Sequence, residues 1–190
     1  MGLKRLRKAI DSIDSEILGL LNKRAGVTLE VGRLKAKGKA SVYVPDREVD
    51  VYKKLTAKNR GPLSSESIKA IYREIMSGAL RLEKALTIAY LGPELTFTHL
   101  ASLKKFGSSV DYASSETITD VFSEVEKERA DYGVVPIENS VEGAVNHTLD
   151  MFMESGVKIC SEVYLEISHS LLSRESGKSK IKKVYSNPQV

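Results

Sequence analysis

Residues 3–37 read LKRLRKAIDSIDSEILGLLNKRAGVTLEVGRLKAK, and this stretch decides the fold of the first half of the chain. Its apolar residues recur at alternating spacings of three and four, which is typical of one long helix packed along its length. They are Leu3, Leu6, Ile10, Ile13, Ile17, Leu20, Val27, Val31 and Leu34. No proline interrupts the pattern, so a single helix is predicted over these residues.

A cation interrupts this apolar stripe. Arg24 occupies the position that the pattern assigns to an apolar residue between Leu20 and Val27. Lys35 follows about three helical turns later and therefore projects from nearly the same face. A buried cation is costly unless an anion meets it, and that anion is either a carboxylate side chain or a bound ligand.

The predicted helix is also too long for one half of the chain. It is about 50 Å long, whereas a compact domain of about 85 residues has a radius of gyration of about 12 Å. Something outside this half must cover the apolar stripe. A second copy of the chain is the simplest cover, so we expect a homodimer formed through the first helix.

The two halves of the chain differ in their hydrophobic period. Residues 45–59 and 64–86 each predict a further helix, the second with Ser64 as its cap. The second half alternates apolar runs with helical stretches, which favours a mostly parallel sheet with crossover helices. Its predicted strands are 88–91, 110–113, 132–135 and 157–167, and its predicted helices are 96–106, 118–125 with Ser114 or Ser115 as cap, and 144–154. We therefore predict an all-helical domain at 1–86 and an α/β domain at 87–190.

Composition narrows the function classes. The 190 residues carry a formal net charge of +4 without a clustered basic run, and no stretch is apolar enough to span a bilayer. Neither nucleic acid nor a membrane is therefore expected as a partner. The single cysteine, Cys160, excludes an internal disulfide, is expected in the core and suits a cytoplasmic protein. His99, His147 and His169 are far apart in sequence, so no metal is expected.

Residues 5–86 resemble the all-helical chorismate mutase family. The matching segments are LRKAIDSID at 6–14, LLNKR at 20–24, EVGRLK at 30–35 and DRE at 46–48. The resemblance implies three helices per chain in an intertwined homodimer, with chorismate as substrate and prephenate as product. The family's reaction is a pericyclic rearrangement that needs no nucleophile, metal or cofactor, so no cofactor is expected.

The resemblance also assigns residues to a mutase site. Arg7 would come from the partner chain, and one chain would supply Arg24, Lys35, Arg47, Glu48 and Glu83. The arginines would bind the two carboxylates of chorismate, Glu48 would accept from the substrate hydroxyl, and Lys35 would donate to the ether oxygen. Arg24, Lys35 and Glu83 are the expected catalytic residues. From the pattern alone, Arg7 and Lys35 are better explained as solvated flanks, and pairing with a glutamate explains Arg24 equally well.

Three positions depart from the family's most familiar form. Val44 stands in place of an acidic residue, Ala79 in place of a serine, and Glu83 in place of a glutamine that donates to the ether oxygen. An ionised carboxylate cannot donate a hydrogen bond, and it repels a dianion. We therefore hypothesise that Glu83 works in its protonated form.

The second half resembles the start of prephenate dehydratase, through YLGPE at 90–94, TFT at 96–98 and GVVPIENSVEG at 133–143. A polar turn directly after a strand of a parallel sheet is where such folds bind ligands. The implied substrate-binding residues are Thr96, Phe97, Glu138, Asn139 and Ser140. Without the resemblance, the turn after the third strand is better explained as a capping turn. Leu95 stands where the family has glycine, which predicts an altered turn.

The resemblance covers only the beginning of a two-lobed dehydratase domain, because the family's catalytic Thr-Arg-Phe stretch does not occur in this sequence. We expect a chorismate mutase that forms part of a bifunctional enzyme of phenylalanine biosynthesis. Little or no dehydratase activity is expected from these 190 residues alone. The alternative is a helical dimerisation scaffold that carries a small-carboxylate-binding α/β module without catalysis.

Overall fold

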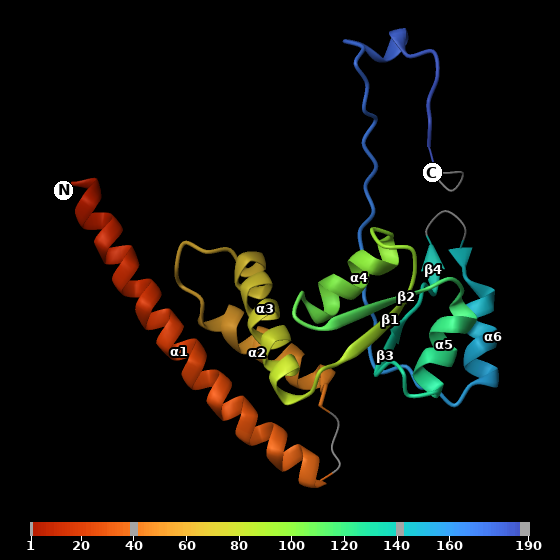
Figure 1. Cartoon of the computed structure of the whole chain (residues 1–190). Helices are drawn as coiled ribbons and strands as arrows, with labels where there is room; N and C mark the ends of the chain where they lie inside the picture. Colours follow the sequence, from red (N-terminus) through yellow and green to blue (C-terminus); the bar gives the residue numbers. More distant parts are fainter. Residues whose placement is uncertain (1, 39–41, 140–142, 187–190) are drawn as a thin grey trace.

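The computed structural model describes residues 2–38, 42–139 and 143–186. Three helices form the first half of the chain, and a small α/β unit follows (Figure 1). This confirms the predicted fold class. The first helix lies along one side of the molecule as a long rod, and the last described segment extends away from the α/β unit (Figure 1).

The three helices are α1 (Leu3–Gly38), α2 (Pro45–Lys58) and α3 (Ser65–Glu83). α2 begins with proline, whose fixed φ suits a first turn where an N–H would have no helical partner. α3 begins after Ser64, whose side chain accepts a hydrogen bond from the Ser67 amide. All three helices were predicted from the sequence, although α3 ends at Glu83, three residues before its predicted end.

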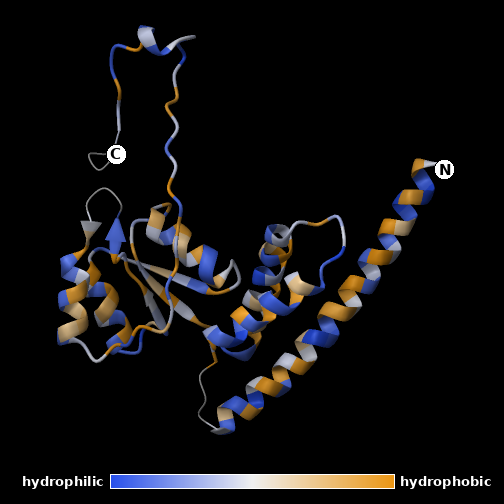
Figure 2. Ribbon diagram, turned by 180° about the vertical axis from the view of Figure 1, so that it is seen from behind, coloured by the Kyte–Doolittle hydropathy of each residue, from blue (hydrophilic) through white to orange (hydrophobic). Residues whose placement is uncertain are grey.

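Most of α1 stands clear of the rest of the chain. The helix has 36 residues, none of which is buried, and Ile13, Leu20 and Leu34 are 54%, 66% and 69% exposed. Apolar residues recur along its whole length in Figure 2. Near its C-terminal end α1 approaches α3, where a Cβ on Gly32 would lie 3.1 Å from Cγ of Glu83. Glycine therefore allows this contact, but the chain itself leaves the apolar stripe uncovered.

Three parallel strands form the sheet of the α/β unit: β1 (Thr87–Leu91), β2 (Asp111–Ser115) and β3 (Tyr132–Val134). β1 lies in the centre of the order β2-β1-β3. α4 (Phe97–Phe106) connects β1 to β2, and α5 (Ile118–Glu126) connects β2 to β3. A short antiparallel pair follows, β4 (Glu138–Asn139) and β5 (Gly143–Ala144), and then α6 (Asn146–Glu154) and the 3₁₀ turn η1 (Lys178–Lys180).

The two faces of the sheet carry different core clusters, because successive residues of β1 point to opposite faces. Ile88 packs with Phe106 of α4 on one face, and Ala89 packs with Val121 of α5 on the other. The first cluster also contains Tyr43, which comes from the segment between α1 and α2. The helical half and the α/β unit therefore share a hydrophobic core.

Two local boundaries were predicted wrongly. The cap of α5 is Thr117, which forms a capping box with Asp120, whereas Ser114 and Ser115 belong to β2. α6 begins two residues later than predicted, because Ala144 pairs with β4 instead of starting the helix. In both cases a neighbouring strand takes the backbone groups that the predicted helix would have used.

The predicted strand at 157–167 is also wrong. The structure describes neither helix nor strand over these residues. An extended segment becomes a strand only beside a neighbour that pairs with its N–H and C=O groups, and no described strand pairs with this one. Cys160 lies on the same segment and is exposed, so its prediction as a core residue fails for the same reason.

Candidate active site

A cavity of about 610 Å³ lies between the three helices of the first half and α4 of the α/β unit. Its lining contains five of the six residues that the sequence assigned to a mutase site. They are Arg24, Lys35, Arg47, Glu48 and Glu83. Two further cations, Arg73 of α3 and Lys105 of α4, line the same cavity. Five cationic and two carboxylate side chains therefore surround it, a surplus that suits an anionic ligand.

Helical spacing brings these side chains together. Arg24 and Lys35 reach the cavity from one face of α1, about three turns apart. Arg47 and Glu48 reach it from the first turn of α2. Glu83 is the last residue of α3. The predicted residues of one chain thus converge from three helices on one cavity.

Two acceptors hold Lys35. Its Nζ lies 3.0 Å from Oε2 of Glu83 and donates a second hydrogen bond to the carbonyl oxygen of Val42 at 2.7 Å. The Glu83 side chain is only 8% exposed, so solvent screens this ion pair weakly. A ligand that draws the ammonium group toward itself must therefore compete with Glu83.

Three donors hold the carboxylate of Glu48. The hydroxyls of Tyr43 and Tyr52 donate to it at 2.9 and 3.2 Å, and Nζ of Lys105 lies 3.2 Å from Oε2. Burial, reinforced by the Glu48 carboxylate, raises the pKa of both tyrosine hydroxyls far above the ordinary value. Both hydroxyls therefore stay protonated and keep donating.

Arg7 lies outside the cavity. It is exposed near the start of α1 and lies about 25 Å along the helix from Arg24. Because α1 is one continuous helix, a single chain does not bring both arginines to one cavity. Only a second chain could supply Arg7 to this site.

The sequence reasoning missed Arg73 and Lys105. Arg73 lies about three turns before Glu83 on α3, so helical spacing could have placed it on the side of the cavity. Lys105 gave no such signal, because it belongs to the α/β unit and reaches Glu48 only through the packing of the two halves.

The residues predicted for the dehydratase half lie near the carboxyl ends of β1 and β3, which are neighbouring parallel strands. Thr96 caps α4, and its hydroxyl donates to the carbonyl oxygen of Leu91 at the end of β1. Phe97 follows it and is 46% exposed. Glu138 and Asn139 form β4 after the end of β3.

The segment that carries Glu138 and Asn139 is anchored from α6. Thr148 is fully buried, and its hydroxyl donates to the carbonyl oxygen of Pro136 at 2.7 Å. Ser140 lies outside the described residues. The four described residues therefore follow the carboxyl ends of two neighbouring strands, and Phe97 and Glu138 among them are exposed.

Over the described part of the chain, no helix combines the length and the apolar character needed to cross a membrane. Nor do three His, Cys, Asp or Glu side chains of the described residues gather as a metal site would require.

Two family models match successive parts of the chain. Residues 6–84 match the family model of chorismate mutase type II, and residues 88–190 match that of prephenate dehydratase. The chain therefore belongs to the prephenate dehydratase family and carries a chorismate mutase type II domain ahead of the dehydratase domain.

Two relatives have the same pair of domains in their names. The bifunctional chorismate mutase/prephenate dehydratase of Aquifex aeolicus is 50% identical over 189 residues, which cover 97% of this chain and 52% of that protein. The enzyme of the same name from Pseudomonas aeruginosa is 47% identical, covering 98% of this chain and 53% of that protein. The chain thus spans about half the length of the curated relatives it matches.

Solved structures also match parts of the chain. Form II of the chorismate mutase from Thermus thermophilus matches with a TM-score of 0.42 and 38% identity, over 43% of this chain and 92% of that one. The prephenate dehydratase from Streptococcus mutans matches with a TM-score of 0.35 and 40% identity, over 36% of this chain and 35% of that one.

Proposed function

We propose that the helical half of this chain rearranges chorismate to prephenate, within a bifunctional enzyme of phenylalanine biosynthesis. One observation carries the proposal: five residues assigned from the sequence line a single cavity in which cations outnumber carboxylates. The match to chorismate mutase type II supports the same reaction.

The charges around the cavity suit a compact dianion. Arg24 on α1 and Arg47 on α2 supply guanidinium groups that can each form two parallel hydrogen bonds with a carboxylate. Glu48, held by its three donors, would accept a hydrogen bond from the substrate hydroxyl. The ligand would thus be held at both ends, and this favours the compact conformer that reacts.

The chemistry needs no proton transfer to the protein. In the rearrangement one C–O bond breaks while one C–C bond forms within the same molecule. The ether oxygen gains negative charge as its bond breaks, and Lys35 would stabilise that charge from a fixed position. We assign Arg24 and Glu83 to the catalytic residues together with Lys35, because both line the same cavity and Glu83 contacts Lys35.

The proposed active form is a homodimer in which Arg7 of each chain completes the site of the other. The uncovered apolar stripe of α1 supports this, because a second long helix would bury residues such as Leu20 and Leu34. The distance between Arg7 and Arg24 along α1 supports it as well, since no single chain brings both to one cavity.

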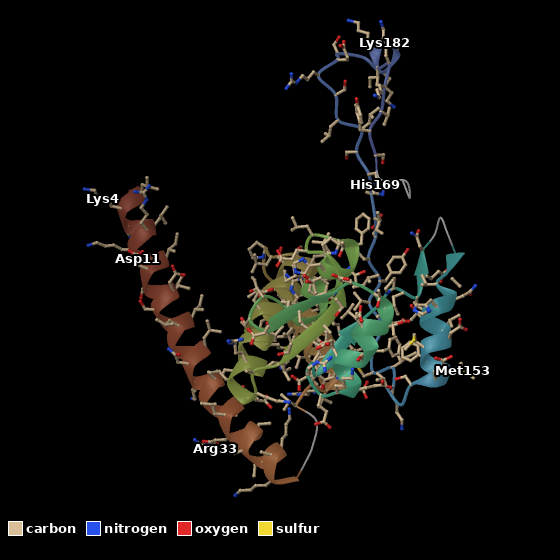
Figure 3. The ribbon with its side chains drawn as sticks, turned by 45° about the vertical axis from the view of Figure 1, so that its right-hand side comes forward. Lys4, Asp11, Arg33, Met153, His169 and Lys182 are labelled. Carbon is tan, nitrogen blue, oxygen red and sulfur yellow. The ribbon has the colours of Figure 1, made fainter. Side chains whose placement is uncertain are left out.

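The test is an assay with chorismate, followed by the loss of its ultraviolet absorbance. We expect the unmodified chain to be active and Arg24→Ala to lower kcat/KM by about 100-fold or more, as when a preorganised charge partner is removed. Arg33→Ala is the matched control. Arg33 is an exposed arginine of the same helix that projects outward in Figure 3, so its loss should leave kcat/KM unchanged. A chain that binds chorismate without consuming it would favour the scaffold alternative.

For the dehydratase half we propose a prephenate-binding edge that includes Thr96, Phe97, Glu138, Asn139 and Ser140. Because Phe97 and Glu138 are exposed, we expect the 190 residues alone to form little phenylpyruvate from prephenate. Ready formation of phenylpyruvate would contradict this. We also propose a cytoplasmic location, because the exposed thiol of Cys160 suits a reducing compartment.

A further inference from the structure

The α/β unit contributes two residues of α4 to the lining of the mutase cavity, Lys105 and Phe106, and only Lys105 is charged. Lys105, near the end of α4, places Nζ 3.2 Å from Oε2 of Glu48, and the two side chains are only 15% and 13% exposed. The same ammonium group lies 5.6 Å from the centre of the Tyr43 ring. This ion pair therefore joins a residue of the dehydratase half to the acceptor assigned to the substrate hydroxyl.

Hydrogen bonds between α3 and the residues just after α4 fix the position of Lys105. The Glu74 carboxylate of α3 accepts hydrogen bonds from the Ser108 amide at 2.9 Å and from its hydroxyl at 2.7 Å. The fully buried Ser77 accepts from the Ser109 amide at 3.0 Å. Gly107 has a φ of 73°, and a Cβ there would lie 2.6 Å from Cβ of Ser77. The residues just after Lys105 thus lock onto α3.

The α/β unit also supports the Glu48 carboxylate indirectly, through Tyr43. Phe106, the neighbour of Lys105, packs against Tyr43 with ring centres 5.1 Å apart. Tyr43 in turn donates its hydroxyl to Oε2 of Glu48. Two of the three donors that hold Glu48 therefore depend on α4 for their position.

The count of donors suggests what this arrangement does. A carboxylate offers about four lone-pair sites. Tyr43, Tyr52 and Lys105 occupy three of them, which leaves one for a substrate hydroxyl. Without the ammonium group, Glu48 would present an uncompensated negative charge to a dianion.

We infer that Lys105 is a positioning residue of the mutase site, which orients and neutralises Glu48 from the dehydratase half. This inference rests on the proposed mutase function. It means that α4 forms part of the mutase catalyst as well as part of the dehydratase fold.

The experiment compares variants of the whole chain with chorismate as substrate. Lys105→Met keeps the stem that packs on Tyr43 but removes the charge, and we expect kcat/KM to fall about tenfold or more. Lys105→Arg restores the charge and should recover most of that loss. Lys104→Met is the matched control: it removes the same charge one residue earlier, from a side chain that is exposed and does not line the cavity, and should leave kcat/KM unchanged.

A second arm separates positioning from a general loss of structure. If Lys105 acts through Glu48, then Lys105→Met introduced into a Glu48→Gln chain should lower kcat/KM by less than about twofold more, because the charge it serves is gone. An equal loss in both backgrounds would overturn the inference, as would an active chain that tolerates Lys105→Met. An unmodified chain that does not consume chorismate would instead overturn the proposed function, and this inference with it.

Discussion

Leu95 has a φ of 67°, in the left-handed region that residues with a Cβ seldom adopt. Its side chain is 83% exposed, so packing offsets little of the resulting strain. Its amide donates to Nδ1 of His99 at 3.0 Å, and the His99 ring stacks on Tyr90 with centres 4.7 Å apart. The turn at Leu95 thus has a backbone that suits glycine, and the hydrogen bond to His99 holds leucine in it.

We expect Leu95→Gly to raise the free energy of unfolding by about 1 kcal/mol, because the left-handed conformation costs other residues about 1–2 kcal/mol and glycine loses part of that gain to its freer unfolded chain. Urea unfolding measures this. Leu95→Ala is the control, since it removes the same exposed side chain but keeps the Cβ, and it should leave stability nearly unchanged. Equal stabilisation by both would show that the exposed leucine, and not the backbone, was the cost.

The protonation of Glu83 depends on whether the site holds a ligand. Its carboxylate forms an ion pair with Lys35, which is the arrangement of an ionised group. A bound dianion would favour the neutral acid instead, because it repels a nearby carboxylate. A protonated Glu83 therefore remains a prediction that concerns the occupied site.

If Glu83 acts as an acid, mutase activity should fall as rising pH removes its proton, and Glu83→Gln should flatten that limb of the profile because an amide donates at every pH. The measurement is the pH profile of kcat/KM for chorismate from roughly pH 5 to pH 9. Glu30→Gln, a change in an exposed residue of α1 outside the cavity lining, should leave the profile unaltered. A Glu83→Gln profile identical to that of the unmodified chain would refute the hypothesis.

At the scale of elements, α1 carries the strongest expectation. Its apolar stripe lacks cover within the chain, and Arg7 and Arg24 lie too far apart along it to share a site. The proposed partner helix, which would bury the stripe and bring Arg7 to the cavity, would account for both observations.

Mixed dimers test this arrangement. Arg7→Ala and Arg24→Ala chains should each be nearly inactive alone, since each homodimer lacks one arginine at both sites. Unfolded and refolded together in equal amounts, they should recover about a quarter of the normal activity, because half of the dimers are mixed and each holds one intact site. If light scattering confirms that the mixture contains dimers but no activity is recovered, the two chains do not share their sites.

The junction of α3 and α4 has an electrostatic signature. Hydrogen bonds from Ser108, with the nearby guanidinium of Arg73, hold the pKa of Glu74 below its usual value. Because the pKa of Glu74 is lower in the folded chain than in the unfolded chain, its ionised carboxylate stabilises the folded state at pH values above the unfolded-state pKa. This contribution to the free energy of unfolding is lost as the pH falls through the lower, folded-state pKa.

Glu74→Gln should therefore lower the unfolding free energy at pH 7, and the difference should shrink as pH falls below 4.5, the ordinary value for this group. We expect less than about 1 kcal/mol, since the side chain is 42% exposed and solvent screens its contacts. Melting temperatures from pH 3 to 7 would reveal the trend (about 4 °C or less for such a change). Glu175→Gln, on the exposed last segment, should show none, and a pH-independent loss in Glu74→Gln would contradict the linkage.

For the whole molecule, the sequence predicted what local periodicity determines. The stripe of α1 placed Arg24 and Lys35 on one face, and the proline and serine starts of α2 and α3 were read correctly. The strand expected at 157–167 failed because strand formation depends on a neighbour that no local pattern reveals. Figure 3 shows Lys182 of the same last segment far from the sheet, whereas the His169 ring lies 5.7 Å from the ring of Phe97 in α4.

The candidate site divides along the same line. Five of its residues follow from spacing and from the family motifs, whereas Lys105 enters through contacts between segments far apart in sequence. Tyr43 lies in a connecting segment with no period of its own, yet it is only 6% exposed because Phe106 and Tyr132 pack against it. Such tertiary contacts require the folded chain.

That packing around Tyr43 limits how the chain can be divided. Tyr43 and Leu86 are 6% and 1% exposed in the whole chain. In a shorter protein that ended at residue 86, both side chains would be exposed to water. A helical half moved into another protein would therefore keep the Tyr43–Phe106 contact only if α4 were moved with it.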